Sequence, residues 1–171
     1  AEYIREKGTD RTKFIRNEID KYSWVDIGSS YLLSEILASI LYAQLEARSK
    51  IQKKRKLIWE NYKKKLHGWA EQNDIKLQQI PTNCKSSYHI FYILVSSAWK
   101  REKLINHLKK SGIKASFHYT PLHTSIMGRK FGYKKGDLPV TEEISEKILR
   151  LPIYNDLNHN LIDFRCFYDF K

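Results

Sequence analysis

The longest apolar pattern in the chain covers residues 34–73, where apolar side chains recur at spacings of three and four. This period predicts one long helix. Ser34 and Glu35 suit its beginning, since a hydroxyl can cap free backbone N–H groups and acidic charge favours the first turn. From Leu33 to Leu45 the pattern is apolar nearly all round, so we expect this half to be buried. From Lys50 on it is polar on most sides and should cross the surface.

A helix that changes environment halfway along is typical of a connection between two domains. We therefore place a domain boundary within residues 48–56, inside the helix. Residues 1–48 would then be the end of one domain, and residues 49–171 would form a second, smaller one.

Beyond residue 80 the pattern changes to short elements. Residues 88–95 are dense in aromatic and β-branched side chains and predict a strand. Residues 99–111 predict an amphipathic helix, and residues 113–119 predict a second strand. A strand, a helix and a strand in this order indicate a βαβ-like crossover.

The last third of the chain predicts two further helices. Thr141 is placed to cap a helix that ends at Leu149, and residues 151–154 read as a short extended piece. Asn158 could cap a last helix that runs to the C-terminus. With the two strands, these elements predict a small α+β domain after about residue 50.

The charge balance of the chain is strongly basic, with a formal net charge of +12. Such a surplus attracts nucleic acid, acidic lipid or phosphorylated small molecules. Many of the lysines lie in residues 50–65, which leaves open a basic module that binds nucleic acid through this helix. A solvated helix face is the alternative, and it is favoured because no zinc finger, aromatic RNA-binding signature or leucine zipper occurs.

Composition and cysteine use point to a reduced, cytoplasmic protein. Apolar residues make up 42% of the chain, enough for a folded core, and no stretch approaches the roughly 18 consecutive apolar residues of a membrane span. Cys84 and Cys166 lie far apart and belong to no metal-binding spacing. We interpret them as two incidental thiols.

Residues 24–35 contain the first segment that could carry chemistry. Gly28, Ser29 and Ser30 precede the long helix, an arrangement that can offer backbone N–H groups and hydroxyls to an anion. A plain capped helix explains the same residues, because many helices begin with serine.

Residues 117–123 contain the second such segment. His118 and His123 flank Pro121, which forces a turn. No third ligand joins them at metal-binding spacing, so we expect no metal site. Both histidines could donate to a phosphate or a sugar hydroxyl, and a structural role is equally open. Residues 149–154 are interpreted as core plus turn.

Taken in order, five segments resemble the C-terminal half of the DegT/DnrJ-type nucleotide-sugar aminotransferases. The segments are Ile4–Thr9, Lys21–Tyr31, Ala43–Glu46, His118–His123 and Leu149–Pro152. The run from Trp24 to Tyr31 is most similar to the dTDP-4-amino-4,6-dideoxygalactose transaminases of bacterial surface-polysaccharide pathways.

The resemblance implies an α/β fold, the C-terminal portion of a fold-type-I transferase that depends on pyridoxal 5'-phosphate (PLP). Residues 1–48 would be the incomplete end of the large PLP-binding domain, followed by a long inter-domain helix and a small α+β domain. It also implies a cytoplasmic homodimer. Its reaction would move an amino group from L-glutamate to a keto carbon, C4 by this resemblance, of a dTDP-linked 6-deoxysugar for polysaccharide biosynthesis.

The resemblance also assigns roles to individual residues. Ser30 stands where many family members have an asparagine that reaches across the dimer to the cofactor phosphate, and Leu32 stands where they have an arginine. Tyr31, His118, Tyr119 and His123 match segments on the substrate side. The Schiff-base lysine of the family lies upstream of the position of Ala1, so the resemblance implies no catalytic residue here and an inactive chain. We expect such a chain to self-associate through the apolar helix at 33–45.

Overall fold

The computed structural model describes residues 1–158 and 162–170. The chain divides into two compact units, Ala1–Arg48 and Ser49–Lys171. The first unit contains the helices α1 (Glu2–Arg5), α2 (Arg11–Ile15) and α3 (Glu35–Glu46). The helices described in the second unit are α4 (Arg48–Gln72, which begins at the unit boundary), α5 (Ala98–Lys110), the 3₁₀ turn η1 (Leu122–Thr124), α6 (Ile126–Lys130), α7 (Pro139–Lys147) and α8 (Arg165–Tyr168). Its strands are β1 (Lys76–Leu77), β2 (Phe91–Leu94), β3 (Ser116–Phe117) and β4 (Ile148–Leu151).

The prediction of one continuous helix over 34–73 was wrong, because α3 ends at Glu46 and α4 starts at Arg48. Ala47 closes α3 with ψ near 0°, and its N–H group donates to carbonyls within α3. The apolar period pauses between Leu45 and Ile51, so no continuous apolar face ties the two helices into one. The predicted cap is confirmed, since the Ser34 hydroxyl accepts from the Leu37 N–H group at 3.3 Å.

The expectation that α3 is buried was also wrong for this chain. Ile36 is 75% exposed, and Leu37 and Ile40 are each 55% exposed. An all-round apolar helix becomes buried only where other elements surround it, and no described segment of the first unit covers α3.

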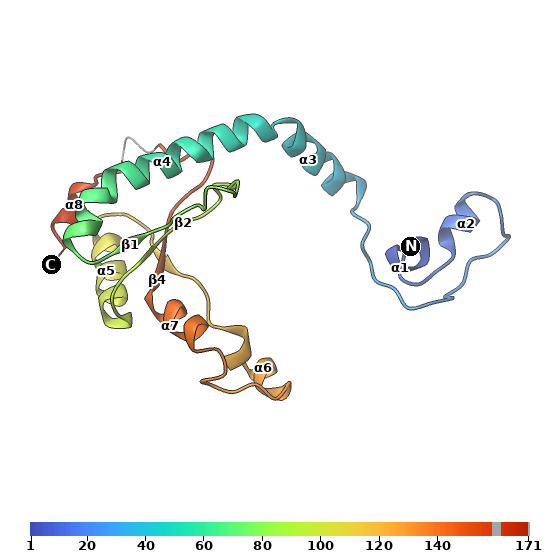
Figure 1. Ribbon diagram of the computed structural model, residues 1–171. Coiled ribbons are helices and arrows are strands. Elements are labelled where there is room, and N and C mark those ends of the chain that lie inside the picture. Colours follow the sequence, from blue (N-terminus) through green and yellow to red (C-terminus); the bar gives the residue numbers. More distant parts are fainter. Residues whose placement is uncertain (159–161, 171) are drawn as a thin grey trace. The chain divides into compact units, whose positions relative to one another are not determined.

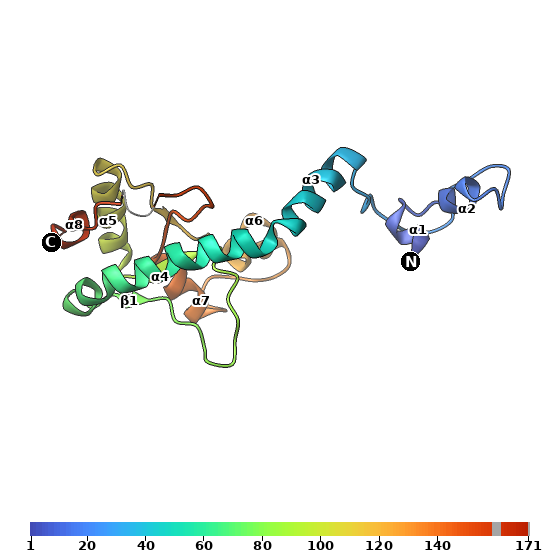
Figure 2. The same ribbon diagram turned by 90° about the horizontal axis from the view of Figure 1, so that it is seen from above.

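The second unit contains a four-stranded antiparallel sheet in the order β1-β2-β4-β3. Figure 1 labels three of these strands, β1, β2 and β4. Because β2 and β3 both run antiparallel to β4, they are parallel to each other, and α5 connects them. The predicted crossover is therefore present, with β4 lying between its two strands. The loop of residues 78–90, which joins β1 to β2, projects away from the sheet (Figure 2).

Three predicted boundaries differ in the structure. The strand predicted from Tyr88 starts at Phe91, because Tyr88 has a φ of 51°, outside the range that a strand allows. The strand predicted over 113–119 is limited to the two residues of β3. The helix predicted to start at Thr141 starts at Pro139, whose fixed φ suits the first helical position.

The end of the chain also departs from the prediction. The helix α7 stops at Lys147, and Leu149 lies in β4. Asn158 caps no described helix, because the last one, α8, begins after Phe164. Residues 159–161, which the predicted final helix would include, lie outside the described residues.

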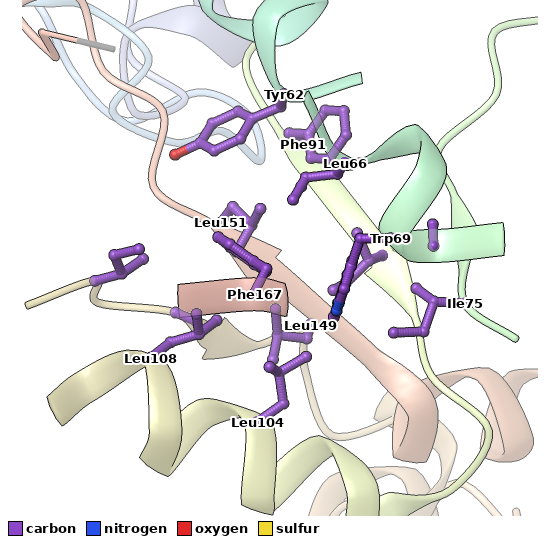
Figure 3. Packing of buried hydrophobic residues seen from close by; sticks show 14 of the residues in the cluster. Tyr62, Leu66, Trp69, Ile75, Phe91, Leu104, Leu108, Leu149, Leu151 and Phe167 are labelled. Atoms are coloured by element: carbon purple, nitrogen blue, oxygen red, sulfur yellow. The ribbon is translucent and has the colours of Figure 1, made fainter. Parts of the chain in front are cut away.

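The core of the second unit lies on one face of the sheet. Leu149 and Leu151 of β4 point into it, and Figure 3 shows side chains from α4, α5 and α8 directed toward them. The residues with the largest fully buried side chains are Tyr62, Leu66, Trp69, Phe91, Ile93, Leu104, Leu108, Leu149 and Phe167. Full burial of one such side chain contributes about 1.5–3 kcal/mol, so this cluster holds the unit together.

None of the helices in the described ranges combines the length and the apolar character that a membrane crossing requires.

Candidate functional site

Backbone hydrogen bonds between residues 3–9 and 23–31 position Ser30 and Tyr31 in the first unit. The N–H group of Lys7 donates to the Ser29 carbonyl at 3.1 Å, and the N–H group of Tyr31 donates to the Arg5 carbonyl at 3.2 Å. Ser30 pairs with Glu6 as an isolated antiparallel bridge. Two short segments are thus held side by side without a regular sheet.

Two glycines allow these segments to approach. A Cβ atom on Gly8 would collide with the backbone carbonyl of Asp26, and Gly8 also has a φ of +75° that favours glycine. A Cβ atom on Gly28 would collide with the backbone of Gly8. Any larger residue at either position would push the two segments apart.

The side chains around Ser30 leave its hydroxyl available. Glu6 is 7% exposed and accepts from the Arg11 guanidinium at 3.0 Å, so this carboxylate is already neutralised. Tyr31 is 67% exposed, and among the described residues the Ser30 hydroxyl has no hydrogen-bond partner. Ser30 can therefore donate one hydrogen bond to a ligand.

His118 and Tyr119 lie together at the end of β3 in the second unit. Their ring centroids are 4.4 Å apart, and the Arg150 guanidinium lies 5.3 Å from the centroid of the Tyr119 ring. Burial lowers the pKa of His118, and the positive charges of Arg150 and His89 lower it further. His118 is therefore held toward its neutral form, which can both donate and accept.

His123 occupies a different environment, because its side chain is paired. It is 6% exposed and its Nε2 atom lies 2.8 Å from the Glu142 carboxylate of α7. Glu142 also accepts from the Gly136 N–H group at 2.6 Å. The hydrogen bond from His123, then that from Gly136, lowers the pKa of Glu142. This pair joins η1 to α7.

A cavity of about 500 Å³ lies beside this pair, between α5, α7 and the segment of residues 117–124. Tyr119, Thr120 and Glu142 line it together with Arg101, which donates to the Ser145 carbonyl at 2.8 Å. An adjoining cavity of about 460 Å³ is lined by His118, Tyr119 and apolar side chains. Tyr119 borders both.

The structure thus groups His118 with Tyr119, places His123 with Glu142, and puts Ser30 and Tyr31 in the other unit. The sequence interpretation missed Arg150 and Glu142. Arg150 lies between two buried leucines in a strand, and this alternation could have indicated that it faces away from the core. Within the described ranges, no group of three or more potential ligands could hold a metal ion.

Comparison with known proteins connects the chain to one family. A sequence profile of the DegT/DnrJ/EryC1/StrS aminotransferase family matches residues 1–164. An archaeal protein without an assigned function, from Methanocaldococcus jannaschii, is 33% identical over 137 residues, which are 78% of this chain and 35% of that protein. The dTDP-3-amino-3,4,6-trideoxy-alpha-D-glucose transaminase of Micromonospora megalomicea subsp. nigra is 29% identical over 138 residues, 80% of this chain and 36% of the relative.

The fold has a solved counterpart. A protein from Streptococcus pneumoniae, described as a candidate sugar aminotransferase and solved in PMP and PLP forms, superposes with a TM-score of 0.79 in its PMP form. The match covers 97% of this chain and 42% of that structure at 22% identity. The fold prediction is confirmed. The chain spans less than half the length of each protein that it matches here.

Proposed function

Because this chain belongs to the DegT/DnrJ/EryC1/StrS aminotransferase family, we propose that the protein works as a PLP-dependent nucleotide-sugar aminotransferase. Its substrate would be a dTDP-linked 6-deoxysugar with a keto group at C4, and L-glutamate would supply the amino group. The match over residues 1–164 is the observation that carries this proposal. The subgroup that we propose is the dTDP-4-amino-4,6-dideoxygalactose transaminases, which serve surface-polysaccharide biosynthesis in the cytoplasm.

Each unit has a part in the proposed enzyme. Residues 1–48 would belong to the large PLP-binding domain, and residues 49–171 would form the small C-terminal domain. The two copies of a homodimer would share their active sites. The similarity of the fold to a protein solved with PLP and PMP supports this assignment of the two units, and the homodimer follows from the family resemblance alone.

Ser30 is the residue of this chain that would hold the cofactor. PLP supplies the electron sink for the amino transfer. The Ser30 hydroxyl is exposed, can donate and has no partner among the described residues, so its chemistry fits the cofactor phosphate. The contact between Gly8 and Gly28 would hold the segment that carries Ser30 in place.

Tyr31, His118, Tyr119 and His123 would act on the substrate side. His118, held toward the neutral form, would make directional hydrogen bonds to the nucleotide sugar. Tyr119 offers an exposed ring beside two cavities. His123 would act through its bond to Glu142, which fixes the segment that carries Tyr119.

Product analysis tests the proposal. The purified full-length enzyme proposed here is supplied with PLP, L-glutamate and, in separate reactions, a dTDP-4-keto-6-deoxysugar or its 3-keto isomer. The sugar product is identified by mass spectrometry and NMR. We expect an amino sugar with nitrogen at C4 and the release of 2-oxoglutarate. Conversion of the 3-keto sugar instead, with nitrogen at C3 as in the name of the Micromonospora relative, would keep the class and refute the carbon assignment. No amino sugar from either keto sugar would refute the class.

The 171 residues alone are a separate test. None of their lysines matches the Schiff-base position that the family resemblance gives, so we expect this chain by itself not to transaminate. Borohydride treatment in the presence of PLP should therefore fix the cofactor to no single lysine. One specifically labelled lysine would contradict this expectation.

The nucleic-acid-binding module considered from the charge pattern has no support in the comparisons. In α4 the Lys56 ammonium pairs with Glu60 at 3.7 Å, and Lys54 pairs with Asp156 at 3.6 Å. Lys63 lies over the Trp59 ring. These contacts are typical of a solvated helix face, and we do not propose this function.

A further inference from the structure

A cavity lined by basic side chains lies on the sheet face opposite the core. Along β4, Leu149 and Leu151 point into the core, so Arg150 points to the other face. The strand partners of Arg150 are Tyr92 on β2 and Ser116 on β3. A cavity of about 240 Å³ opens beside it, lined also by His89, Lys114 and Tyr154.

The polar side chains of this cavity are donors or can act as donors. Arg150 and Lys114 carry positive charge, His89 has an imidazole ring that can donate, and Ser116 and Tyr154 offer hydroxyls. No carboxylate lines the cavity, and within the described ranges no ion pair involves Arg150. A cluster of positive charge without a counter-ion is costly unless an anion occupies it.

Among the described residues, the buried Nε atom of Arg150 has no hydrogen-bond partner in the lining of this cavity. The Nδ1 atom of His118, which lines a different cavity, also has none. Within residues 1–158 and 162–170, the one hydrogen bond of the Arg150 side chain is long: its Nη2 atom donates to the Ser116 hydroxyl at 3.4 Å. A buried guanidinium N–H group is expected to have a strong acceptor, so the lining lacks an anionic one.

We propose that this cavity is a phosphoryl-binding subsite, with Arg150 as its main ligand and Lys114 and His89 as supporting groups. The geometry favours a phosphoryl oxygen because a guanidinium, an ammonium and hydroxyls line one cavity, contributed by residues 114–116, β4 and the residues that follow β4. The identity of the anion as the diphosphate of the nucleotide sugar rests on the proposed function. The preference for an anion rests on the lining alone.

NMR spectroscopy of the histidine rings in the 171-residue chain tests the proposal, with inorganic pyrophosphate as the probe at constant ionic strength. We expect saturable shifts of the His89 and His118 resonances. We also expect the pKa of His118 to rise, because a bound anion offsets the positive charges of Arg150 and His89 that lower it. Arg150→Gln should weaken pyrophosphate binding at least about tenfold, the scale of one charge-assisted hydrogen bond.

Two further variants keep the test decisive if Arg150→Gln disturbs the fold. Lys114 is exposed, so Lys114→Gln should leave the sheet intact and still weaken binding, by about threefold. Arg150→Lys keeps the charge and should retain part of the affinity. The matched control is Arg165→Gln, which removes an exposed guanidinium at α8, outside the cavity. It should bind pyrophosphate as the wild type does.

Three outcomes would overturn the proposal. They are shifts that grow linearly without saturation, equal weakening by Arg165→Gln and Arg150→Gln, and displacement of pyrophosphate by L-glutamate as effectively as by dTDP. The last would assign the pocket to a carboxylate. These experiments measure binding of an anion and not transamination. A negative result would therefore refute the phosphoryl subsite without refuting the proposed aminotransferase reaction, which product analysis tests separately.

Discussion

Two glycines should respond in opposite ways to the same added methyl group. Gly28→Ala forces a Cβ atom against the backbone of Gly8 and should destabilise the contact between residues 3–9 and 23–31 by about 1–3 kcal/mol, as overpacking does. Gly68→Ala places its Cβ atom at the exposed side of α4. The nearest atom there is the Tyr168 hydroxyl at 3.9 Å, an ordinary van der Waals contact, so the methyl group fits. It should stabilise the helix by about 0.5–1 kcal/mol.

Hydrogen exchange separates the two effects. Faster exchange of the Val25 and Asp26 amides, which donate to the Gly8 carbonyl, is expected in Gly28→Ala alone. Unchanged protection of these amides would show that the close approach is dispensable.

The His123–Glu142 pair predicts how stability depends on acid. The folded-state pKa of Glu142 is lowered from its ordinary value of 4.5, mainly by the hydrogen bond from His123 and then by that from Gly136, with a smaller effect of the Lys135 charge. The carboxylate therefore stabilises the fold fully above about pH 4.5, and this contribution is lost as the pH falls through the lowered pKa. Glu142→Gln should flatten that part of the pH profile.

Urea unfolding of both proteins between about pH 6 and pH 3 measures this effect. Glu146→Gln removes an exposed carboxylate from the same helix and serves as the control for lost charge. If wild type and Glu142→Gln lose stability in parallel on acidification, the pair does not have this role.

Single residues differ in how far the sequence could predict their role. The motif at 118–123 pointed to both histidines, because their order along the chain resembles a family segment. The partner of His123 lies 19 residues away on α7, and no local period connects positions so far apart. The role of Arg150 was missed for another reason. A residue between two leucines is interpreted as part of the core unless the segment is known to be a strand, in which alternate side chains face opposite sides of the sheet.

At the scale of elements, prediction succeeded for a helix whose amphipathic period is uninterrupted. The helix predicted over 99–111 is α5, Ala98–Lys110, with Ser97 accepting from the Lys100 N–H group at its start. The sequence did not predict strand β4, because β4 follows α7 without a turn and has only four residues. Four residues are too few to distinguish the period of a strand from that of a helix. Only its pairing with both β2 and β3 makes it the centre of the sheet.

The central position of β4 predicts a high cost for shortening its core side chains. Leu149 is fully buried, so Leu149→Ala should lower the free energy of unfolding by about 2–5 kcal/mol through lost burial and a cavity. Leu57→Ala removes the same atoms from an exposed position on α4 and should change it by less than about 0.5 kcal/mol. Chemical denaturation of the two variants gives this difference, and similar values for both would contradict a core centred on β4.

At the scale of the whole chain, the two units have different sources of order. The second unit has a continuous apolar core beneath its sheet. The first unit is held by backbone hydrogen bonds, a close glycine contact and the Glu6–Arg11 ion pair. The period of apolar residues could predict the apolar core of the second unit. It could not predict the contacts of the first unit, because hydrogen bonds between irregular segments leave no repeat in the sequence.

The exposed apolar surface of α3 leads to the last prediction, self-association of the 171-residue chain. Ile36, Leu37, Ile40 and Leu41 lie on a helix with no covering segment among the described residues of its unit, and removing such a patch from water is favourable. Sedimentation velocity over a range of concentrations should show dimers or larger species. The double change Leu37→Glu with Leu41→Glu should shift the chain to monomer, because charges cannot be buried in that contact. Leu57→Glu adds a charge at an exposed leucine of α4 and should leave the association unchanged. A wild-type chain that stays monomeric at tens of micromolar, or a Leu57→Glu variant that dissociates like the double variant, would rule out α3 as the contact.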